Sequence, residues 1–157
     1  MSAATSPHTI AVVGPGDLAE LLVLMRAYCD FYAVDPSDAA LLELSRALIA
    51  DPEREGLQLI ARDGAGAAVG FATVFWTWAT TSASRIGVMN DLYLAPEARG
   101  NGLAERLIEA CAEHCLRRGA TSLEWLTAPS NRRAQAVYAR VGAAREDWLN
   151  YALALAP

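Results

Sequence analysis

The sequence has no uninterrupted apolar run near the roughly 20 residues that a transmembrane helix needs, so we expect no membrane partner. Residues 1–7 are small and polar, without the basic start and apolar stretch of a signal peptide, which favours a cytoplasmic protein. Positive charge is also scarce, since 13 lysines and arginines are set against 18 aspartates and glutamates. The resulting net charge of −5 argues against nucleic-acid binding, which requires a basic surface.

Cysteine and histidine are also scarce, with three and two residues respectively. An odd cysteine count without a secretion signal does not indicate a disulfide framework. Cys111 and Cys115 lie four residues apart on one apolar helix face, which is typical of buried, reduced thiols. A metal site needs more ligands than this pattern offers, so we expect none. Two histidines supply no Ser-His-Asp or Cys-His set, which argues against an acyl-enzyme intermediate.

Apolar residues, in contrast, are plentiful. They make up 54% of 157 residues, which predicts a single domain with a full hydrophobic core. Periodicity and turn signals predict the order β-αα-βββ-α-β-α-β, a mixed α/β fold. The expected strands are 9–13, 57–62, 67–78, 85–94, 121–127 and 148–155, and the expected helices are 18–32, 41–49, 103–118 and 130–140.

The most informative segment is the strand, turn and helix of residues 91–118. The strand ends near Leu94, and a turn containing Gly100 and Gly102 leads into the helix. The first N–H groups of a helix have no intrahelical partner, and the helix dipole adds partial positive charge there. Glycines allow close approach of a phosphate, and Arg99 adds a full charge. The segment is therefore suited to binding a pyrophosphate.

Spacing separates three kinds of glycine turn. A nucleotide P-loop needs Gly-Lys-Ser/Thr, but Gly102 is followed by Leu103. A dinucleotide fingerprint needs a small residue where this chain has Glu105, whose charge would repel pyrophosphate. The pattern that fits is Arg-x-x-Gly-x-Ala, at Arg99, Gly102 and Ala104. It resembles the acetyl-CoA signature of the GNAT superfamily of N-acetyltransferases, Gln/Arg-x-x-Gly-x-Gly/Ala.

Two further segments carry this resemblance. Residues 92–97 end the preceding strand as the family's strand ends, and residues 127–142 are similar to the family pattern T-x-x-x-N-x-x-A-x-x-x-Y-x-x-x-G. The resemblance implies a GNAT-like, mostly antiparallel sheet flanked by helices. It implies a flexible N-terminus over residues 1–7 and a single N-acetyltransferase domain over residues 8–157. Residues 28–32 and 90–94 look, more loosely, like the histone/polyamine acetyltransferase subgroup.

The resemblance also implies a function, the transfer of acetyl from acetyl-CoA to a primary amine by direct attack. The acceptor could be a small amine, a polyamine, an amino acid or a peptide amine. The implied cofactor-binding residues are Leu92, Tyr93, Leu94, Arg99, Gly100, Asn101, Gly102, Leu103 and Ala104. Asn131 either bonds the cofactor arm or caps a helix. A domain that senses acetyl-CoA without catalysis is the alternative, and retention of Tyr138 and Asn131 argues against it.

Catalysis needs a proton for the leaving thiolate and a group that takes the amine proton. Tyr138 matches the family's tyrosine, and a phenol with a pKa near ~10 suits a thiol with a pKa near ~8.5. Asp91, beside the presumed thioester strand, and Glu124, on the next strand, are both candidate bases. Strand alternation places Asp91 on the opposite face from Leu92.

The acceptor pocket is expected between the first helices and the third strand. Its candidate residues are Tyr28, Phe31, Tyr32 and Trp76, whose rings could hold an alkylammonium by cation–π contact or could simply belong to the core. Trp76 and Trp78 share a strand face, so we expect both to be buried or both exposed. Exposed tryptophans would suit the interface of the homodimer that we expect.

Overall fold

The computed structural model describes residues 8–156, and the predicted flexible segment 1–7 lies outside them. A single sheet has the strand order β1-β2-β3-β4-β5. Its strands are β1 (Thr9–Val12), β2 (Gly56–Arg62), β3 (Ala68–Ala79), β4 (Ser84–Leu94) and β5 (Leu123–Glu124). The first three pairings are antiparallel, whereas β4 and β5 run parallel. The predicted mixed, mostly antiparallel sheet is confirmed.

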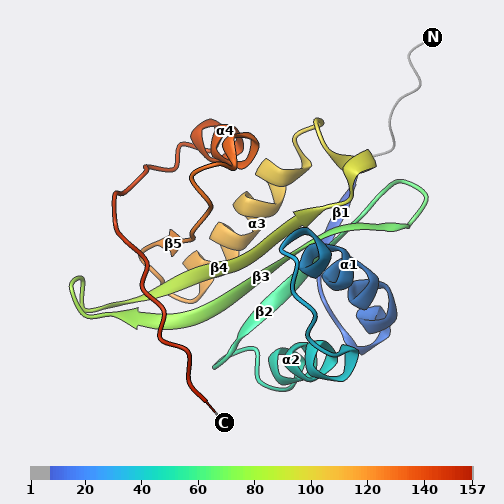
Figure 1. Ribbon diagram of the computed structural model, residues 1–157, viewed down its shortest axis with the longest axis horizontal. Coiled ribbons are helices and arrows are strands. Elements are labelled where there is room, and N and C mark those ends of the chain that lie inside the picture. The colour runs from blue at the N-terminus through green and yellow to red at the C-terminus, as the bar shows by residue number, and fades with distance from the viewer. Residues whose placement is uncertain (1–7, 157) are drawn as a thin grey trace.

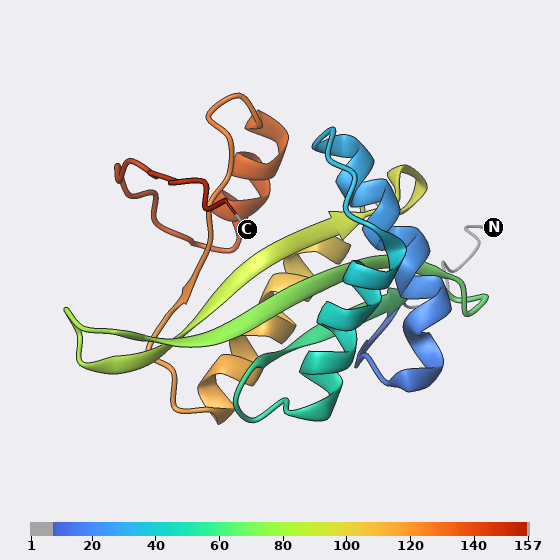
Figure 2. The ribbon, with the colours of Figure 1, turned by 60° about the horizontal axis from the view of Figure 1, so that its bottom comes forward.

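Helices cover both faces of this sheet, α1 and α2 on one and α3 on the other (Figures 1 and 2). They are α1 (Leu18–Phe31), α2 (Asp38–Ala50), α3 (Leu103–Arg117) and α4 (Arg132–Arg140), with 3-10 turns η1 (Pro15–Asp17) and η2 (Pro96–Ala98). Figure 1 shows α4 beside α3, on the side of the sheet that ends with β5. Within residues 8–156, none of the helices is long and apolar enough to cross a membrane.

Helix α3 fills the core beneath β2, β3 and β4 because its apolar residues recur on one face. Its buried side chains are Leu103, Leu107, Ile108, Cys111 and Cys115. Both cysteines are free thiols, as the sequence predicts. A second core, on the opposite face of the sheet, joins α1 to side chains such as Ile60 and Phe71. The sheet therefore fixes α1 and α3 on either side of β4.

Truncation of Leu107 to alanine is expected to lower the free energy of unfolding by about 2–5 kcal/mol, because this fully buried side chain would leave a cavity. Urea denaturation followed by circular dichroism measures the change. The matched control is Leu116→Ala on the same helix, where the side chain is 72% exposed and the cost should stay within about 0.5 kcal/mol. Equal losses in the two variants would contradict this description of the core.

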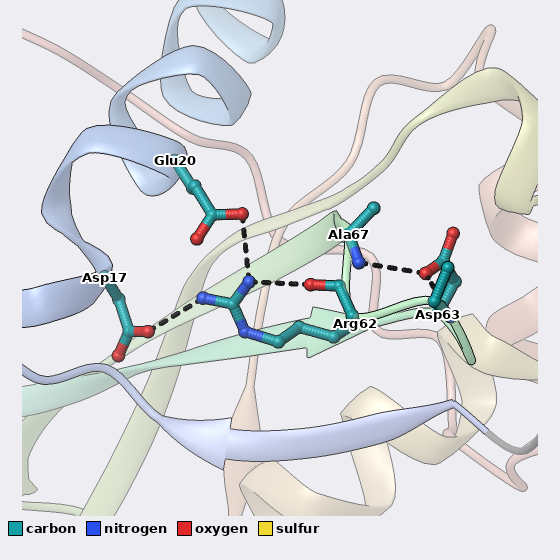
Figure 3. Close-up of polar contacts among 7 residues, drawn as sticks. Asp17, Glu20, Arg62, Asp63 and Ala67 are labelled. Carbon is teal, nitrogen blue, oxygen red and sulfur yellow. Dashed lines mark hydrogen bonds and ion pairs between the residues drawn. The ribbon is translucent and has the colours of Figure 1, made fainter.

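The start of α1 is fixed to β2 by Arg62 (Figure 3). Its guanidinium donates to Asp17 at 2.8 Å, to Glu20 at 2.9 Å and to the carbonyl of Gly66 at 3.0 Å. Asp17 also accepts the N–H of Gly14 at 2.8 Å, and this bond is the main reason why the pKa of its carboxyl is lowered. These bonds position the axis of α1, whose other end reaches the candidate site.

The predicted last strand is wrong. Residues 148–155 form no strand and lie exposed, although their large apolar side chains alternate as in a strand. A strand needs a neighbour whose backbone completes its hydrogen bonds. The predicted strand over 121–127 shortens to Leu123–Glu124, and within the described chain no strand pairs with the C-terminal segment.

Candidate functional site

β4 carries a β-bulge close to the point where β5 leaves it. The pairing with β3 shifts by one residue between Met89 and Asp91, so Asn90 is the extra residue. In the described structure, β5 pairs with β4 at Gly87 and Val88 and no further. A bulge bends a strand and increases its twist. The last residues of β4 therefore have a backbone edge that no strand of residues 8–156 covers.

The turn after β4 presents free amides, as the sequence predicts. Gly100 and Gly102 both have a φ of 82°, which favours glycine because a side chain would be strained there. Asn101 accepts the N–H of Leu103 at 3.2 Å and so fixes the turn at the first residue of α3. The N–H groups of Gly100, Gly102 and Ala104 have no partner among residues 8–156. They are available to an anion at the helix N-terminus.

Arg99 is held beside this turn. Its Nε donates to the carbonyl of Leu94 at 3.0 Å, and its guanidinium carbon lies 5.9 Å from the ring centroid of Tyr93. Both contacts fix the side chain against the end of β4. The guanidinium therefore places a positive charge close to the free amides of the turn.

The carboxylate of Glu105 forms an ion pair with a residue outside the Arg-x-x-Gly-x-Ala motif. Arg140 of α4 donates to its carboxylate at 2.6 Å, and this bond is the main cause of the lowered pKa of Glu105. The negative charge that disfavours pyrophosphate is therefore compensated. The same ion pair holds α4 against the first turn of α3.

The N-terminal end of α4 is capped by Asn131, whose side-chain oxygen accepts the N–H of Ala134 at 3.2 Å. Of the two roles considered for Asn131, the structure shows the cap. Tyr138 lies further along α4. Its ring centroid is 5.2 Å from that of Trp125, and the two rings meet edge-on. Burial raises the pKa of Tyr138, although a hydrogen bond with Thr127 partly opposes this. The phenol therefore stays protonated at neutral pH.

Aromatic side chains from the end of α1 face this helix. The ring centroid of Tyr32 lies 4.9 Å from that of Tyr28 and 5.1 Å from that of Phe31. Tyr32 and Tyr138 line the same cavity, and Tyr32 makes a small contribution to the raised pKa of Tyr138. Figure 2 shows the end of β4 between α4 and the end of α1.

Asp91 lies on the α1 side of β4, behind these rings. Burial raises the pKa of its carboxyl, while hydrogen bonds with Thr73, Tyr28 and Asn90 lower it by less. The amide of Asn90 donates to it at 3.0 Å, and the hydroxyl of Tyr28 lies 3.4 Å from the carbonyl of Asn90. Glu124 is exposed and accepts instead from Ser122 at 2.9 Å. Asp91 is therefore the carboxyl placed next to the aromatic residues.

One cavity of about 660 Å³ joins the turn, α4 and the end of α1, within the usual size range of ligand sites. The predicted residues that line it are Tyr28, Phe31, Tyr32, Leu92, Tyr93, Leu94, Arg99, Gly100, Gly102, Leu103, Ala104, Asn131 and Tyr138. Residues that the sequence did not indicate are Glu105, Arg133, Ala134, Ala136, Val137 and Arg140. Asp91 and Asn101 do not line it, but each contacts a lining residue, Tyr28 and Leu103 respectively. Arg133 and Arg140 belong to no recognised sequence motif. They are brought to the cavity only because α4 packs on α3.

Trp76 does not line this cavity, and the prediction that it binds substrate is corrected. It is 8% exposed, packs in the α3 core, donates its Nε1–H to the carbonyl of Pro52 at 2.8 Å and stacks with Arg118. Trp78 shares its strand face but is 64% exposed, so the expectation that both tryptophans are buried or both exposed is wrong. The β3–β4 hairpin extends beyond the helices that cover the sheet (Figure 2).

No group of three or more histidine, cysteine, aspartate or glutamate side chains is arranged to hold a metal ion in residues 8–156. The polar groups that line the cavity are backbone amides, arginines and phenols, and one of these phenols, Tyr28, is hydrogen-bonded to the carboxyl of Asp91. This set can bind an anion at one end and a cation at the other, and it can supply a proton between them.

Comparison with known proteins gives a consistent result. Residues 21–143 match the family model described as the acetyltransferase (GNAT) family. The chain is 31% identical over 128 residues to the uncharacterized N-acetyltransferase YhfO of Bacillus subtilis, covering 80% of this chain and 83% of that protein. It is 31% identical over 75 residues to the thialysine N-epsilon-acetyltransferase of Bos taurus, covering 48% of this chain and 44% of that protein.

A solved structure shares the fold. The aminoglycoside N-acetyltransferase AAC(6')-Iy, determined in complex with CoA, superposes with a TM-score of 0.82 at 18% identity, covering 98% of each chain.

Proposed function

This chain belongs to the acetyltransferase (GNAT) family and is therefore an acyltransferase, and we propose that it moves acetyl from acetyl-CoA to the primary amine of a small molecule. The observation that carries the proposal is the cavity of about 660 Å³, which connects the free amides before α3 to the aromatic end of α1. With its pyrophosphate bound at the free amides before α3, an extended cofactor would have its thioester near β4. An amine at the second end then lies on the other side of that thioester.

The donor would be held by three parts of the chain. The diphosphate would accept hydrogen bonds from the amides of Gly100, Gly102 and Ala104, with Arg99 adding charge. The pantetheine arm carries amide groups, and the uncovered backbone edge of residues 92–94 could pair with them as with an added strand. The divergence of β5 from β4 leaves room for this arm.

The reaction then needs two proton transfers and no acyl-enzyme. The amine nitrogen attacks the thioester carbonyl, the C–S bond breaks, and Tyr138 protonates the departing thiolate to give free CoA. The proton of the attacking amine passes to Asp91, directly or through water. An N–H of β4 stabilises the negative charge that develops on the carbonyl oxygen.

A cationic acceptor suits the other end of the cavity. The rings of Tyr28, Phe31 and Tyr32 offer π faces to an alkylammonium, and Asp91 offers a negative charge once deprotonated. The name of the Bos taurus relative specifies thialysine, an amino acid with a primary amine on a flexible chain. We propose this class, amino acids and polyamines, as acceptors.

A thiol-release assay with an amine panel tests the proposed function. The panel contains thialysine, lysine, D-amino acids, spermidine and an aminoglycoside, each with acetyl-CoA. We expect release of free CoA and formation of an N-acetyl product with at least one amine. Micromolar acetyl-CoA binding without release on the whole panel would support the non-catalytic sensor instead.

Replacement of Asp91 by asparagine is expected to lower kcat/KM by roughly 100-fold, because the variant keeps the shape of the side chain but accepts no proton. In the wild type, activity should rise as pH increases through the pKa of Asp91. Since burial raises that pKa, this limb lies at higher pH than an exposed aspartate would give. The limb should disappear in the variant.

The pH profile of kcat/KM in both proteins measures this effect. Glu124→Gln is the matched control, because that carboxyl is exposed and outside the cavity. A wild-type profile in Asp91→Asn would exclude Asp91 as the base.

A further inference from the structure

The fully buried polar side chains among residues 8–156 gather in one place. They are Ser45, Gln58 and Thr73, each at most 2% exposed. The Oγ of Ser45 and the Nε2 of Gln58 both lie 3.7 Å from the sulfur of Met25. Burial of polar groups costs free energy that apolar side chains would not cost, even when hydrogen bonds offset much of it. Their grouping therefore indicates that they do more than fill the core.

Two of these residues form a polar row with Asp91 across the sheet. Gln58 of β2 is the register partner of Thr73 in β3, and Thr73 is the register partner of Asp91 in β4. Side chains at directly opposed positions lie on one face of a sheet, with their Cβ atoms about 4.5–5.5 Å apart. Helix α1 covers this face (Figure 1), since Met25, which Gln58 contacts, belongs to that helix. At the other end of the row, Asp91 is hydrogen-bonded to Tyr28 of the same helix.

The hydrogen bonds of the polar row run in one direction. The Nε2 of Gln58 donates to the hydroxyl oxygen of Thr73 at 3.1 Å. Thr73 is also hydrogen-bonded to Asp91, and because a threonine hydroxyl has a single hydrogen, that hydrogen is left for the carboxylate. An ionised carboxylate can only accept, which fixes the order of the three groups. The row therefore ends at Asp91 with an O–H donor that favours the charged form of the carboxyl.

The Gln58 end of the row lies beneath α2. The Oε1 of Gln58 is buried, and no group of residues 8–156 donates a hydrogen bond to it. Gln58 and Ser45 line a cavity of about 80 Å³ between α2 and the sheet, which is large enough to hold water. A water molecule that donates to Oε1 would hold the amide with its N–H groups toward Thr73. Both sides of the Gln58 amide would then be fixed.

We propose that Gln58 and Thr73 are positioning residues for acetyl transfer, which hold the Asp91 carboxylate in place and stabilise its charged form. This inference rests on the proposed function, in which Asp91 takes the proton of the attacking amine. Neither Gln58 nor Thr73 lines the cavity of about 660 Å³, so both act through Asp91. Burial raises the pKa of Asp91, and the hydrogen bond from Thr73 is the largest of those that oppose this shift. Without the row, a smaller fraction of Asp91 would be ready to accept a proton.

The groups around Asp91 make its titration easy to interpret. The titratable group that faces it from α1 is the phenol of Tyr28, with Tyr32 beyond, and its partners in the sheet, Thr73 and Asn90, are neutral. Burial raises the pKa of Tyr28, and the neighbouring Asp91 adds to this, so the phenol stays protonated. The causes of the shift at Asp91 include no charged side chain of residues 8–156. A pH limb that moves in a variant of the row therefore reports on Asp91.

Removal of the Thr73 hydroxyl tests the row. Thr73→Val keeps the shape of the side chain, and the rising limb of kcat/KM should move to higher pH. At pH values below the limb, kcat/KM should fall roughly 10-fold, as expected for the loss of one hydrogen bond to a charged group. Above the limb it should equal the wild-type value. Thr73→Ser restores a hydroxyl and should restore the profile, whereas the matched control Thr77→Val, at an exposed position of β3, should leave it unchanged.

Gln58→Met tests the other hydrogen bond of the row. The limb should move in the same direction but by less, because Thr73 keeps its hydroxyl and loses only the donor that orients it. Carbon-13 NMR of protein labelled at the aspartate carboxyls measures the titration of Asp91 without substrate, with Asp91→Asn to assign the signal. We expect the pKa of Asp91 to be highest in Thr73→Val, intermediate in Gln58→Met and lowest in the wild type.

The two measurements separate the possible failures. An Asp91 titration that is unchanged in Thr73→Val would overturn the row, whatever the activity. A titration that moves while the pH limb of an active enzyme stays would overturn its role in catalysis. A loss of kcat/KM that is equal at all pH values would show that Gln58 and Thr73 only support the fold. A wild type that releases no CoA with any amine of the panel would instead refute the proposed function, and the role in catalysis with it.

Discussion

Replacement of Gly102 by glutamate is expected to weaken acetyl-CoA binding by 100-fold or more. The new carboxylate would stand directly before the first residue of α3, a few ångströms from the proposed diphosphate. At an effective dielectric constant of about 20, two unit charges about 4 Å apart repel each other by roughly 4 kcal/mol. Nothing lies within 4 Å of the position that a Cβ would take at Gly102, so the loss would come from charge and backbone conformation rather than from a clash within the protein.

Gly102→Ala separates these two contributions, and isothermal calorimetry with acetyl-CoA measures both variants. Alanine at a φ of 82° carries a conformational cost of roughly 1–2 kcal/mol but brings no charge. It should therefore lower thermal stability as the glutamate variant does, while keeping affinity within about 10-fold of the wild type. Wild-type affinity in Gly102→Glu would mean that the diphosphate binds elsewhere.

Replacement of Tyr138 by phenylalanine is expected to slow the chemical step by 100-fold or more, within the usual range of about 10²–10⁴ for a general acid. The substitution keeps the ring that packs edge-on against Trp125 and removes the hydroxyl alone. Because burial raises the pKa of this phenol, the wild-type group remains a proton donor across the neutral range. The variant can supply no proton to the thiolate.

Single-turnover measurement of thiol release isolates this step from product dissociation, and calorimetry provides the control. The affinity for acetyl-CoA should stay close to that of the wild type, since the proposed diphosphate site is the turn before α3, away from Tyr138. A wild-type rate in Tyr138→Phe would remove the phenol from the mechanism. A loss of affinity equal to the loss of rate would give Tyr138 a binding role instead.

The parts of the fold that follow from short-range pattern were predictable. The four-residue recurrence of Leu103, Leu107, Cys111 and Cys115 is enough to define the buried face of α3, because residues four apart share one side of a helix. The Arg-x-x-Gly-x-Ala spacing likewise predicts free amides before α3, because the requirement for glycine is local to the turn.

The features that depend on distant neighbours were not predictable. No residue type in the sequence marks the bulge at Asn90. The extra residue shifts the alternation of β4, so that residues on the two sides of the bulge no longer face the sheet surfaces that simple alternation predicts. The ion pair between Glu105 and Arg140 joins residues 35 positions apart. Strand alternation predicts that Trp76 and Trp78 lie on the same face of the sheet. It does not predict their burial, which depends on how far along β3 the helices cover that face.

The free amides before α3 are the central feature of the proposed site, and a crystal structure of the chain grown with CoA tests them most directly. We expect the diphosphate oxygens about 3 Å from the backbone nitrogens of Gly100, Gly102 and Ala104, with the pantetheine arm along residues 92–94. A diphosphate bound at any other place on the molecule would contradict it.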